Sequence, residues 1–182
     1  MKKIILLSMI LFCSTMYSQN NIPNLPIDSI TKKITYSEVI VDSLTNKQEL
    51  FSRAREWFAK AYNSSTNVIQ MEDKESGKII GKALMSVNTK SLGVIFPNGN
   101  INYTISIYIK DGKYKYEITD FNHTDVIHGG GFGDCEKMIN PKKGYKYIFD
   151  YFLPQLDNNI RALVIDLKSG MKTKKGIKKD EW

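Results

Sequence analysis

The sequence has little cysteine, and this scarcity limits the ways in which the chain can be cross-linked. Only two cysteines occur in 182 residues, Cys13 near the N-terminus and Cys135 in the C-terminal half. If the N-terminal segment is removed after export, Cys135 remains as a single thiol without an intramolecular partner. The sequence therefore excludes an internal disulfide in the mature chain, and it leaves open whether Cys135 is buried or pairs with another molecule.

Long apolar runs are also missing. The longest covers residues 4–13, follows Lys2 and Lys3, and precedes a short polar stretch at residues 14–19. This arrangement is typical of a secretory signal peptide and is too short for a permanent membrane span. We therefore expect residues 1–19 to be a signal peptide and the protein to be exported, periplasmic or extracellular, with no integral membrane segment once the signal is removed.

Lipid attachment is the alternative fate of the N-terminal segment. Cys13 is the only residue there that could carry a lipid, but bulky Phe12 stands where a lipobox requires a small side chain. Lipid anchoring at Cys13 is therefore not expected. Mass spectrometry of the mature N-terminus separates cleavage near Ser18 or Gln19 from processing at Cys13.

The chain also lacks a strong charge excess of one sign. Without residues 1–19, it has 24 Lys and Arg against 19 Asp and Glu, which gives a net charge of +5. The excess gathers at residues 172–182, which we expect to form a basic C-terminal tail that is solvated and mobile. A nucleic-acid partner needs a basic face and does not suit an exported protein, so none is expected.

The mature chain is long enough to form one domain. Pro23 and Pro26 favour an extended leader at residues 20–30, because proline disfavours helix and cannot donate to a β-ladder. The mature length of about 163 residues suits a single core. We therefore expect one domain at residues 31–171.

Local patterns predict the first half of this domain. Residues 34–41 are rich in β-branched side chains and predict a strand, and residues 47–62 predict an amphipathic helix. Its apolar positions are Leu50, Phe51, Ala54, Trp57, Phe58, Ala61 and Tyr62. Residues 68–72 and 79–87 predict a hairpin, whose second strand carries small side chains on one face where a helix can approach. A polar link is expected at residues 88–100.

The strongest local signal lies at residues 101–121, where Asp111 and Gly112 favour a two-residue type I′ turn. The resulting register places every apolar cross-strand pair on one face of the sheet. Those pairs are Ile109 with Tyr114, Ile107 with Tyr116, and Ile105 with Ile118. The other face receives Tyr108 with Lys115, Ser106 with Glu117, and Thr104 with Thr119.

The last part of the chain predicts an irregular loop and a helix. Residues 122–146 contain no clear pattern, and such a long excursion in a compact domain is typical of a functional loop. Helical spacing resumes after Pro154 and is expected to end at Gly170. The order β-α-β-β-β-β-α indicates an α+β fold with a curved antiparallel sheet, two helices packed on one face and the other face open.

The chain resembles a known family, the secreted bacterial domain of unknown function with a TATA-binding-protein-like (TBP-like) fold. The similarity rests on the sequences ITYSEVIVDS, RAREWFAKAY, SGKIIGKA and YIKDGKYKYEITDF. It implies the same element order, the curved sheet and an envelope or extracellular location. It implies no reaction, no catalytic residue and no cofactor, and a fold of this name does not imply DNA binding.

Candidates for chemistry lie in the glycine-rich segment 122–137. Its potential metal donors are His123, Asp125, His128, Asp134 and Cys135. They lack recognised metal-ligand spacing, and a His128–Cys135 base and nucleophile pair lacks a supporting motif. The run at residues 128–131 is similar to an oxyanion-hole glycine run, but the chain has no G-x-S-x-G nucleophile motif. We therefore assign no catalytic, cofactor-binding or metal-binding residue.

The open sheet face is the better candidate for function. Tyr108, Lys115, Glu117 and Thr119 would present an aromatic ring, two charges and a hydroxyl on a rigid support, which suits reversible contact. On this face Lys115 is balanced by Glu117 two residues further along the chain, and no cationic stripe is expected. The leading hypothesis is an exported non-catalytic module that binds an envelope protein, peptide or glycan.

Two alternatives to a binding module stay open at this point. One is a small envelope hydrolase or metal-binding protein that uses segment 122–137, with His123, His128 and Cys135 as its candidate residues. The other is a scaffold piece of a larger envelope assembly. A half-exposed sheet also shows a polar outer face when it has no partner at all.

Overall fold

The structure is a computed structural model that describes residues 23–62, 65–91, 93–125, 130–139 and 151–172. The expected signal peptide, the tail beyond residue 172 and His128 lie outside the described residues. In chain order the elements are β1 (Tyr36–Val41), α2 (Lys47–Ala61), α3 (Ser65–Val68), β2 (Ile69–Asp73), β3 (Lys78–Ser91), β4 (Val94–Lys110), β5 (Lys113–Asp125), β6 (Gly130–Asp134), the 3₁₀ helix η2 (Cys135–Met138) and α4 (Leu153–Met171).

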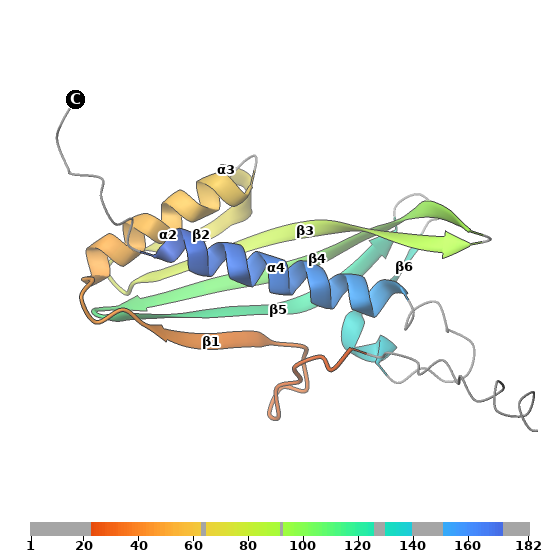
Figure 1. Ribbon diagram of the computed structural model, residues 1–182, viewed down its shortest axis with the longest axis horizontal. Coiled ribbons are helices and arrows are strands. Elements are labelled where there is room, and N and C mark those ends of the chain that lie inside the picture. Colours follow the sequence, from red (N-terminus) through yellow and green to blue (C-terminus); the bar gives the residue numbers. More distant parts are fainter. Residues whose placement is uncertain (1–22, 63–64, 92, 126–129, 140–150, 173–182) are drawn as a thin grey trace, which may run out of the picture.

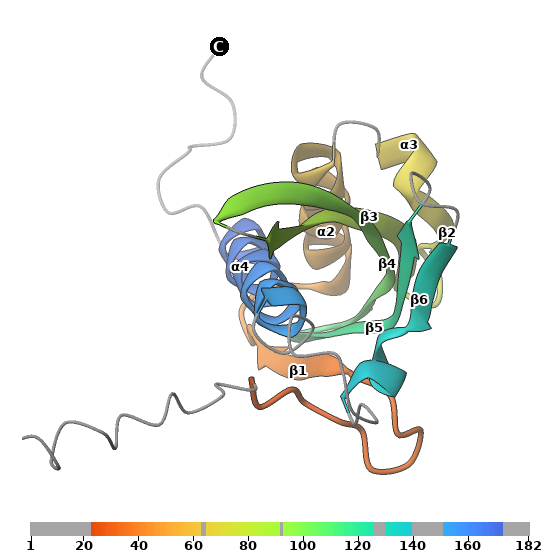
Figure 2. The same cartoon turned by 90° about the vertical axis from the view of Figure 1, so that its right-hand side faces the viewer.

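In the part of the chain that the structure describes, one antiparallel sheet of six strands organises the domain. Its order is β1-β5-β4-β3-β2, and β6 pairs with β5 off this path. The two long helices, α2 and α4, lie on the same side of the sheet, which curls around them (Figures 1 and 2). This confirms the α+β fold class with an open outer face. None of the described helices combines the length and the apolar character needed to cross a membrane.

Helix α2 forms where the sequence predicts it. The Asn46 side chain caps its start by accepting a hydrogen bond from the Glu49 backbone N–H at 2.9 Å. The residues of the apolar stripe that are buried in the core are Leu50, Phe51, Ala54, Trp57 and Phe58. Ala61, at the end of the same stripe, is exposed.

Two glycines allow the helices to pack closely. A Cβ atom on Gly81 of β3 would lie 2.7 Å from the Phe58 ring, so α2 does approach the small-residue face of this strand. A Cβ atom on Gly170 would lie 2.8 Å from the Trp57 ring. The expectation that Gly170 ends its helix is wrong, because α4 continues to Met171 and uses Gly170 to pack against α2.

The register of the β4–β5 hairpin is confirmed pair by pair, from Lys110 opposite Lys113 to Thr104 opposite Thr119. The turn type is wrong, however. A type I′ turn needs positive φ at both central residues, and Gly112 has φ 71° whereas Asp111 does not have positive φ. The Asp111 side chain instead accepts from the Lys47 N–H at 2.8 Å, which ties the turn to the start of α2.

A β-bulge interrupts the alternation of β5. Asp120 has φ 60°, and the pairing of β4 with β5 shifts at this point. Asp120 and Phe121 together lie opposite Tyr103, so one extra residue enters β5. Ile118 and Phe121, which are three residues apart, are therefore both buried in the core.

The expected polar link at residues 88–100 is wrong, because β3 and β4 continue as a paired ribbon to Ser91 and Val94. We call residues 88–98 the arm. Figure 1 shows that the ribbon extends beyond α4, so the arm is not covered by a helix. Val94, Ile95 and Phe96 are consequently exposed although they belong to a strand. Without a buried face, the arm has no alternating pattern that could have revealed it.

The expected irregular loop at residues 122–146 is also wrong where it can be seen. Residues 122–125 continue β5, Gly130–Asp134 forms β6, and Cys135–Met138 forms the helical turn η2. Residues 126–129 and 140–150 lie outside the described residues. The bulge at Asp120 hides the strand pattern, because it reverses which side chains point inward.

Candidate functional site

The side of the sheet away from α2 and α4 carries the candidate binding residues, and we call it the outer face. Its centre is a row across four strands, which the register sets as Val39, Lys115, Tyr108 and Lys78. The next row toward the β4–β5 turn contains Val41, Lys113 and Lys110. The face therefore places cations directly beside exposed apolar side chains.

Tyr108 lies between two ammonium groups. The Nζ atom of Lys78 is 5.5 Å from the centroid of the Tyr108 ring, and Nζ of Lys115 is 5.8 Å from it. Both distances are within the range of a cation–π contact. The Tyr108 ring thus has one cation from β3 and one from β5, the two strands that flank its own.

Glu117 neutralises one of these cations. Its Oε2 atom accepts a hydrogen bond from Lys115 Nζ at 2.8 Å, and the two residues lie on the same face of β5. The hydrogen bond to Glu117 raises the pKa of Lys115, so the ammonium stays charged at physiological pH.

A shallow hollow of about 430 Å³ opens beside Tyr108. We call it the Tyr108 hollow, and it is lined by Val39, Tyr108, Lys110, Lys113, Tyr114 and Lys115. Val39 has 56% of its surface exposed there. The hollow therefore combines an apolar wall, an aromatic ring and three ammonium groups on adjacent strands, which makes it suited to an anionic ligand with an apolar part.

The fourth residue predicted for this face, Thr119, has a structural role. Its hydroxyl donates to the Ile34 carbonyl oxygen at 3.1 Å and lies 3.1 Å from the Thr35 hydroxyl. Tyr108, Lys115 and Glu117 are thus brought together as predicted, whereas Thr119 holds residues 34 and 35, which connect the leader to β1.

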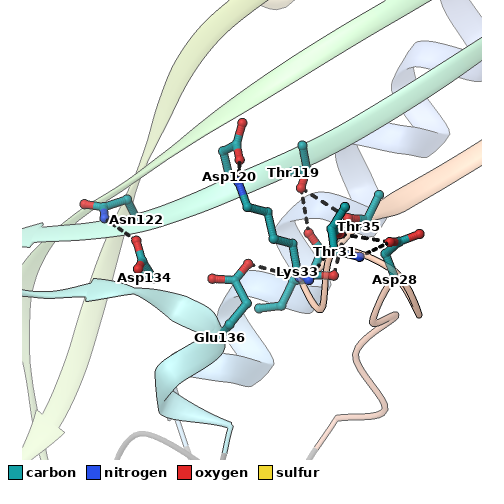
Figure 3. Close-up of polar contacts among 10 residues, drawn as sticks. Asp28, Thr31, Lys33, Thr35, Thr119, Asp120, Asn122, Asp134 and Glu136 are labelled. Carbon is teal, nitrogen blue, oxygen red and sulfur yellow. Dashed lines mark hydrogen bonds and ion pairs between the residues drawn. The ribbon is translucent and has the colours of Figure 1, made fainter.

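Figure 3 shows how residues 28–35 are attached to the rest of the domain. Lys33 forms an ion pair with Asp120, and Glu136 of η2 accepts from the Ile34 N–H at 3.0 Å. Asp28 stabilises a turn by accepting from the Thr31 N–H at 2.7 Å. The described part of the leader is therefore not simply extended, since it folds back and pairs Ile27 with Ile34.

His123 is a core residue rather than part of a functional loop. Only 1% of its surface is exposed, and its ring packs edge-on against Phe152 at 5.0 Å. Its Nε2 atom lies 2.6 Å from the Asn98 carbonyl oxygen. A carbonyl oxygen only accepts, so Nε2 carries the proton and donates to the base of the arm.

Cys135 is buried as well. It has no exposed surface, and burial raises the pKa of its thiol to about 12. The thiolate is the nucleophilic form, so this thiol is almost entirely unreactive at neutral pH. Among the described residues no group of three His, Cys, Asp or Glu side chains is arranged to hold a metal. His128, the partner proposed for Cys135, lies outside the described residues.

Larger hollows lie elsewhere on the domain, and two of them lie beside helices. One, of about 870 Å³, lies where α3 meets β3, and the other, of about 860 Å³, lies where the end of β1 meets the ends of α2 and α4. Arg53, which lines the second, pairs with both Asp42 and Glu49, and Lys168 there pairs with Glu38. These contacts leave less charge available to a ligand than the lysines around Tyr108 do.

Sequence reasoning missed the lysines that β3 contributes. The alternation of residues 79–87 places Lys82 on the face opposite Ile79 and Gly81, and extending it back by one residue adds Lys78. Only the pairing of β3 with β4 brings Lys78 beside Tyr108 and Lys82 beside Thr104. The expectation that the outer face gathers no cationic stripe is therefore wrong, because Lys78, Lys110, Lys113 and Lys115 lie on neighbouring strands of it.

Solved structures share this fold. A DUF4468 family protein from Bacteroides ovatus matches with a TM-score of 0.65 and 14% identity, covering 82% of this chain and 91% of that one. A TBP-like protein from Parabacteroides distasonis matches with a TM-score of 0.60 and 18% identity, covering 81% and 96%. At these identities the likeness concerns the fold alone.

No curated protein shows significant similarity to the chain. The family model described as "Domain of unknown function (DUF4468) with TBP-like fold" matches residues 36–124, which run from the start of β1 almost to the end of β5. Residues 36–124 thus match the DUF4468 family of TBP-like domains, whose function is not known.

Proposed function

We propose that this protein is an exported, non-catalytic binding module whose outer face contacts a protein, peptide or glycan of the cell envelope. The Tyr108 hollow is the observation that carries the proposal. It concentrates an aromatic ring, apolar surface and charge on paired strands, and rigid elements hold a binding surface more accurately than loops do. Export is supported by the signal-like residues 1–19.

The rival function, a hydrolase or metal-binding protein that uses segment 122–137, has weaker support. His123 is held by the Asn98 carbonyl and by Phe152, and Cys135 is enclosed by the core. Neither side chain is accessible to a substrate without local opening of the domain. The outer face needs no such rearrangement.

Chemical cross-linking and affinity capture from the native envelope test this proposal. The full chain is compared with Tyr108→Ala and Lys115→Glu, and Lys60→Glu on the far side of α2 serves as the control for added negative charge. We expect both outer-face variants to lose the captured partner and the control to retain it. Capture that is indifferent to Tyr108→Ala and Lys115→Glu would rule out the outer face.

Export has its own test, which is mass spectrometry of the protein recovered from the native host. We expect an N-terminus close to Asn20 in a soluble envelope fraction. A chain that begins at Met1 and stays in the cytoplasm would contradict export, and a lipid on Cys13 would replace the soluble form by an anchored one.

A further inference from the structure

The lysines around the Tyr108 hollow carry charge that the domain itself does not neutralise. Lys78, Lys110 and Lys113 form no ion pair with any described residue, whereas Lys115 is paired with Glu117. Three ammonium groups within two neighbouring rows of a sheet repel one another. Binding of an anionic group between them would relieve this repulsion, and it would do so most effectively at low ionic strength.

Two acidic side chains close to these lysines in the sheet are hydrogen-bonded to backbone N–H groups. The Asp111 carboxylate accepts from the Lys47 N–H at 2.8 Å. The Asp73 carboxylate, across from Lys78, accepts from the backbone N–H groups of Glu75 and Ser76 at 2.9 and 3.0 Å. Neither carboxylate forms an ion pair with Lys78, Lys110 or Lys113, so these ammonium groups can still pair with an anionic ligand.

The same surface has an apolar side. Val39 and Val41 of β1 have 56% and 72% of their surfaces exposed, and they lie opposite Lys115 and Lys113. An anion without apolar groups would leave both valines in water. A ligand that fits the whole surface therefore combines carboxylates with at least one apolar side chain, as an acidic peptide segment does.

The environment of Tyr108 favours a peptide over a glycan. Sugar rings are commonly bound by stacking on a free aromatic face, but the ring of Tyr108 has Lys78 and Lys115 ammonium groups at 5.5 and 5.8 Å from its centroid. These groups attract carboxylates and hinder stacking of a neutral ring. An extended peptide also presents every second side chain on the same side, so it can offer carboxylates and an apolar side chain to one surface.

We infer that the outer face around Tyr108 binds an acidic peptide segment of a partner protein. Carboxylates of the segment pair with Lys78, Lys110 and Lys113, and one apolar side chain of the segment enters the Tyr108 hollow beside Val39. This inference rests on the proposed function, because it names the partner of the same surface. Charge complementarity of this kind chiefly sets the association rate and the choice of partner.

Fluorescence anisotropy of short labelled peptides tests the inference on the mature chain. One probe is rich in glutamate with interspersed leucine and serine, and its matched probe has every glutamate replaced by glutamine. Polygalacturonate, an anionic glycan, is the third probe. We expect only the glutamate peptide to bind, with an affinity that falls as salt is added. The protein amides whose NMR chemical shifts change on binding should lie on the outer face.

Variants locate the binding site. The double variant Lys78→Gln with Lys113→Gln should weaken binding of the glutamate peptide by about fivefold, since each exposed pair contributes modestly. The control removes the same charge elsewhere by combining Lys60→Gln with Lys137→Gln, two exposed lysines on α2 and η2. This control should bind the peptide as the unmodified chain does.

Each remaining outcome counts against the inference in a distinct way. Equal binding of the glutamine peptide, preference for polygalacturonate, or indifference to the lysine variants would overturn the acidic-peptide assignment. If Tyr108→Ala still abolishes native capture in such a case, the binding-module proposal survives. If native capture is also indifferent to Tyr108→Ala, both proposals are wrong.

Discussion

The Nε2 atom of His123 lies 2.6 Å from the carbonyl oxygen of Asn98, and this hydrogen bond joins the far end of β5 to the base of the arm. The histidine is on β5 and Asn98 is on β4, so the bond reinforces the pairing just past the Asp120 bulge. A residue that the sequence marks as a candidate for chemistry therefore serves to hold two strands together.

Substitution of His123 should reduce stability. In His123→Leu the Asn98 carbonyl loses its buried donor and Phe152 loses its edge-on partner, which should cost about 1–3 kcal/mol of unfolding free energy. Urea denaturation followed by circular dichroism measures this cost. His123→Gln can donate the same bond from its amide and should lose less, and a His123→Leu variant as stable as the parent would contradict the structural role.

The Cys135 thiol should resist alkylation in the folded protein. Burial raises its pKa from 9.0 to about 12, so the thiolate needed for reaction with iodoacetamide is scarce at pH 8. Mass spectrometry should find Cys135 unmodified in the native chain and fully alkylated after unfolding in urea. Rapid alkylation of the native protein at pH 8 would contradict this environment.

The same thiol should make stability depend on alkaline pH. The unfolded chain loses this proton near pH 9 and the folded chain only near pH 12, so the unfolded state is favoured progressively as the pH rises through this window. Below pH 9 the buried neutral thiol makes its full contribution to the free energy of unfolding. Buried tyrosines such as Tyr114, whose pKa is also raised by burial to about 12, act in the same direction. The contribution of Cys135 is therefore measured as the difference in urea melts between the parent and Cys135→Ala across the window.

Asp120 should tolerate glycine better than a β-branched residue. Its φ of 60° costs about 1 kcal/mol for most L-residues and nothing for glycine. Asp120→Gly and Asp120→Val both remove the exposed ion pair with Lys33, so the difference between their thermal melts isolates the backbone term. We expect the valine variant to melt lower, and equal melting temperatures would show that the bulge does not require positive φ.

Gln155 should stabilise the arm. Its amide accepts from the Asn88 N–H at 3.1 Å and donates to the Asn88 carbonyl at 2.7 Å, which imitates a neighbouring strand at an edge of the sheet. Gln155→Ala should speed hydrogen exchange at residues 87–89 and 94–98 by roughly tenfold or less, as loss of about 1 kcal/mol implies. Asn158→Ala, an exposed change on the same helix, is the control and should leave this exchange unchanged.

Elements with local causes could be predicted from the sequence. The β4–β5 register follows from the position of Gly112 and from alternation in each strand, and both depend on residues close together in the chain. Helix α2 follows from its capping Asn46 and its apolar stripe. Each of these elements is determined by its own residues and their near neighbours in the chain, so it can be predicted without knowing any distant contact.

Features with distant causes could not be predicted. The arm has no buried face, and the Asp120 bulge reverses the alternation on which strand prediction depends. The inward position of His123 follows from that bulge, and the burial of Cys135 follows from the packing of η2 against the sheet. The candidate site was half predicted: Tyr108 and Lys115 are cross-strand neighbours within one hairpin, whereas Lys78 reaches Tyr108 only through the separate pairing of β3 with β4.

The sequence by itself thus determined the α+β fold, the hairpin register and the sorting of apolar from polar side chains, because turn chemistry and hydrophobic periodicity act over a few residues. Tertiary structure alone decided which polar side chains meet. Long-range strand pairing placed Lys78 beside Tyr108 and buried His123 and Cys135. Pairing of that kind depends on how the whole core closes, and for this reason the cationic hollow at Tyr108, and not the glycine-rich segment, became the candidate binding site.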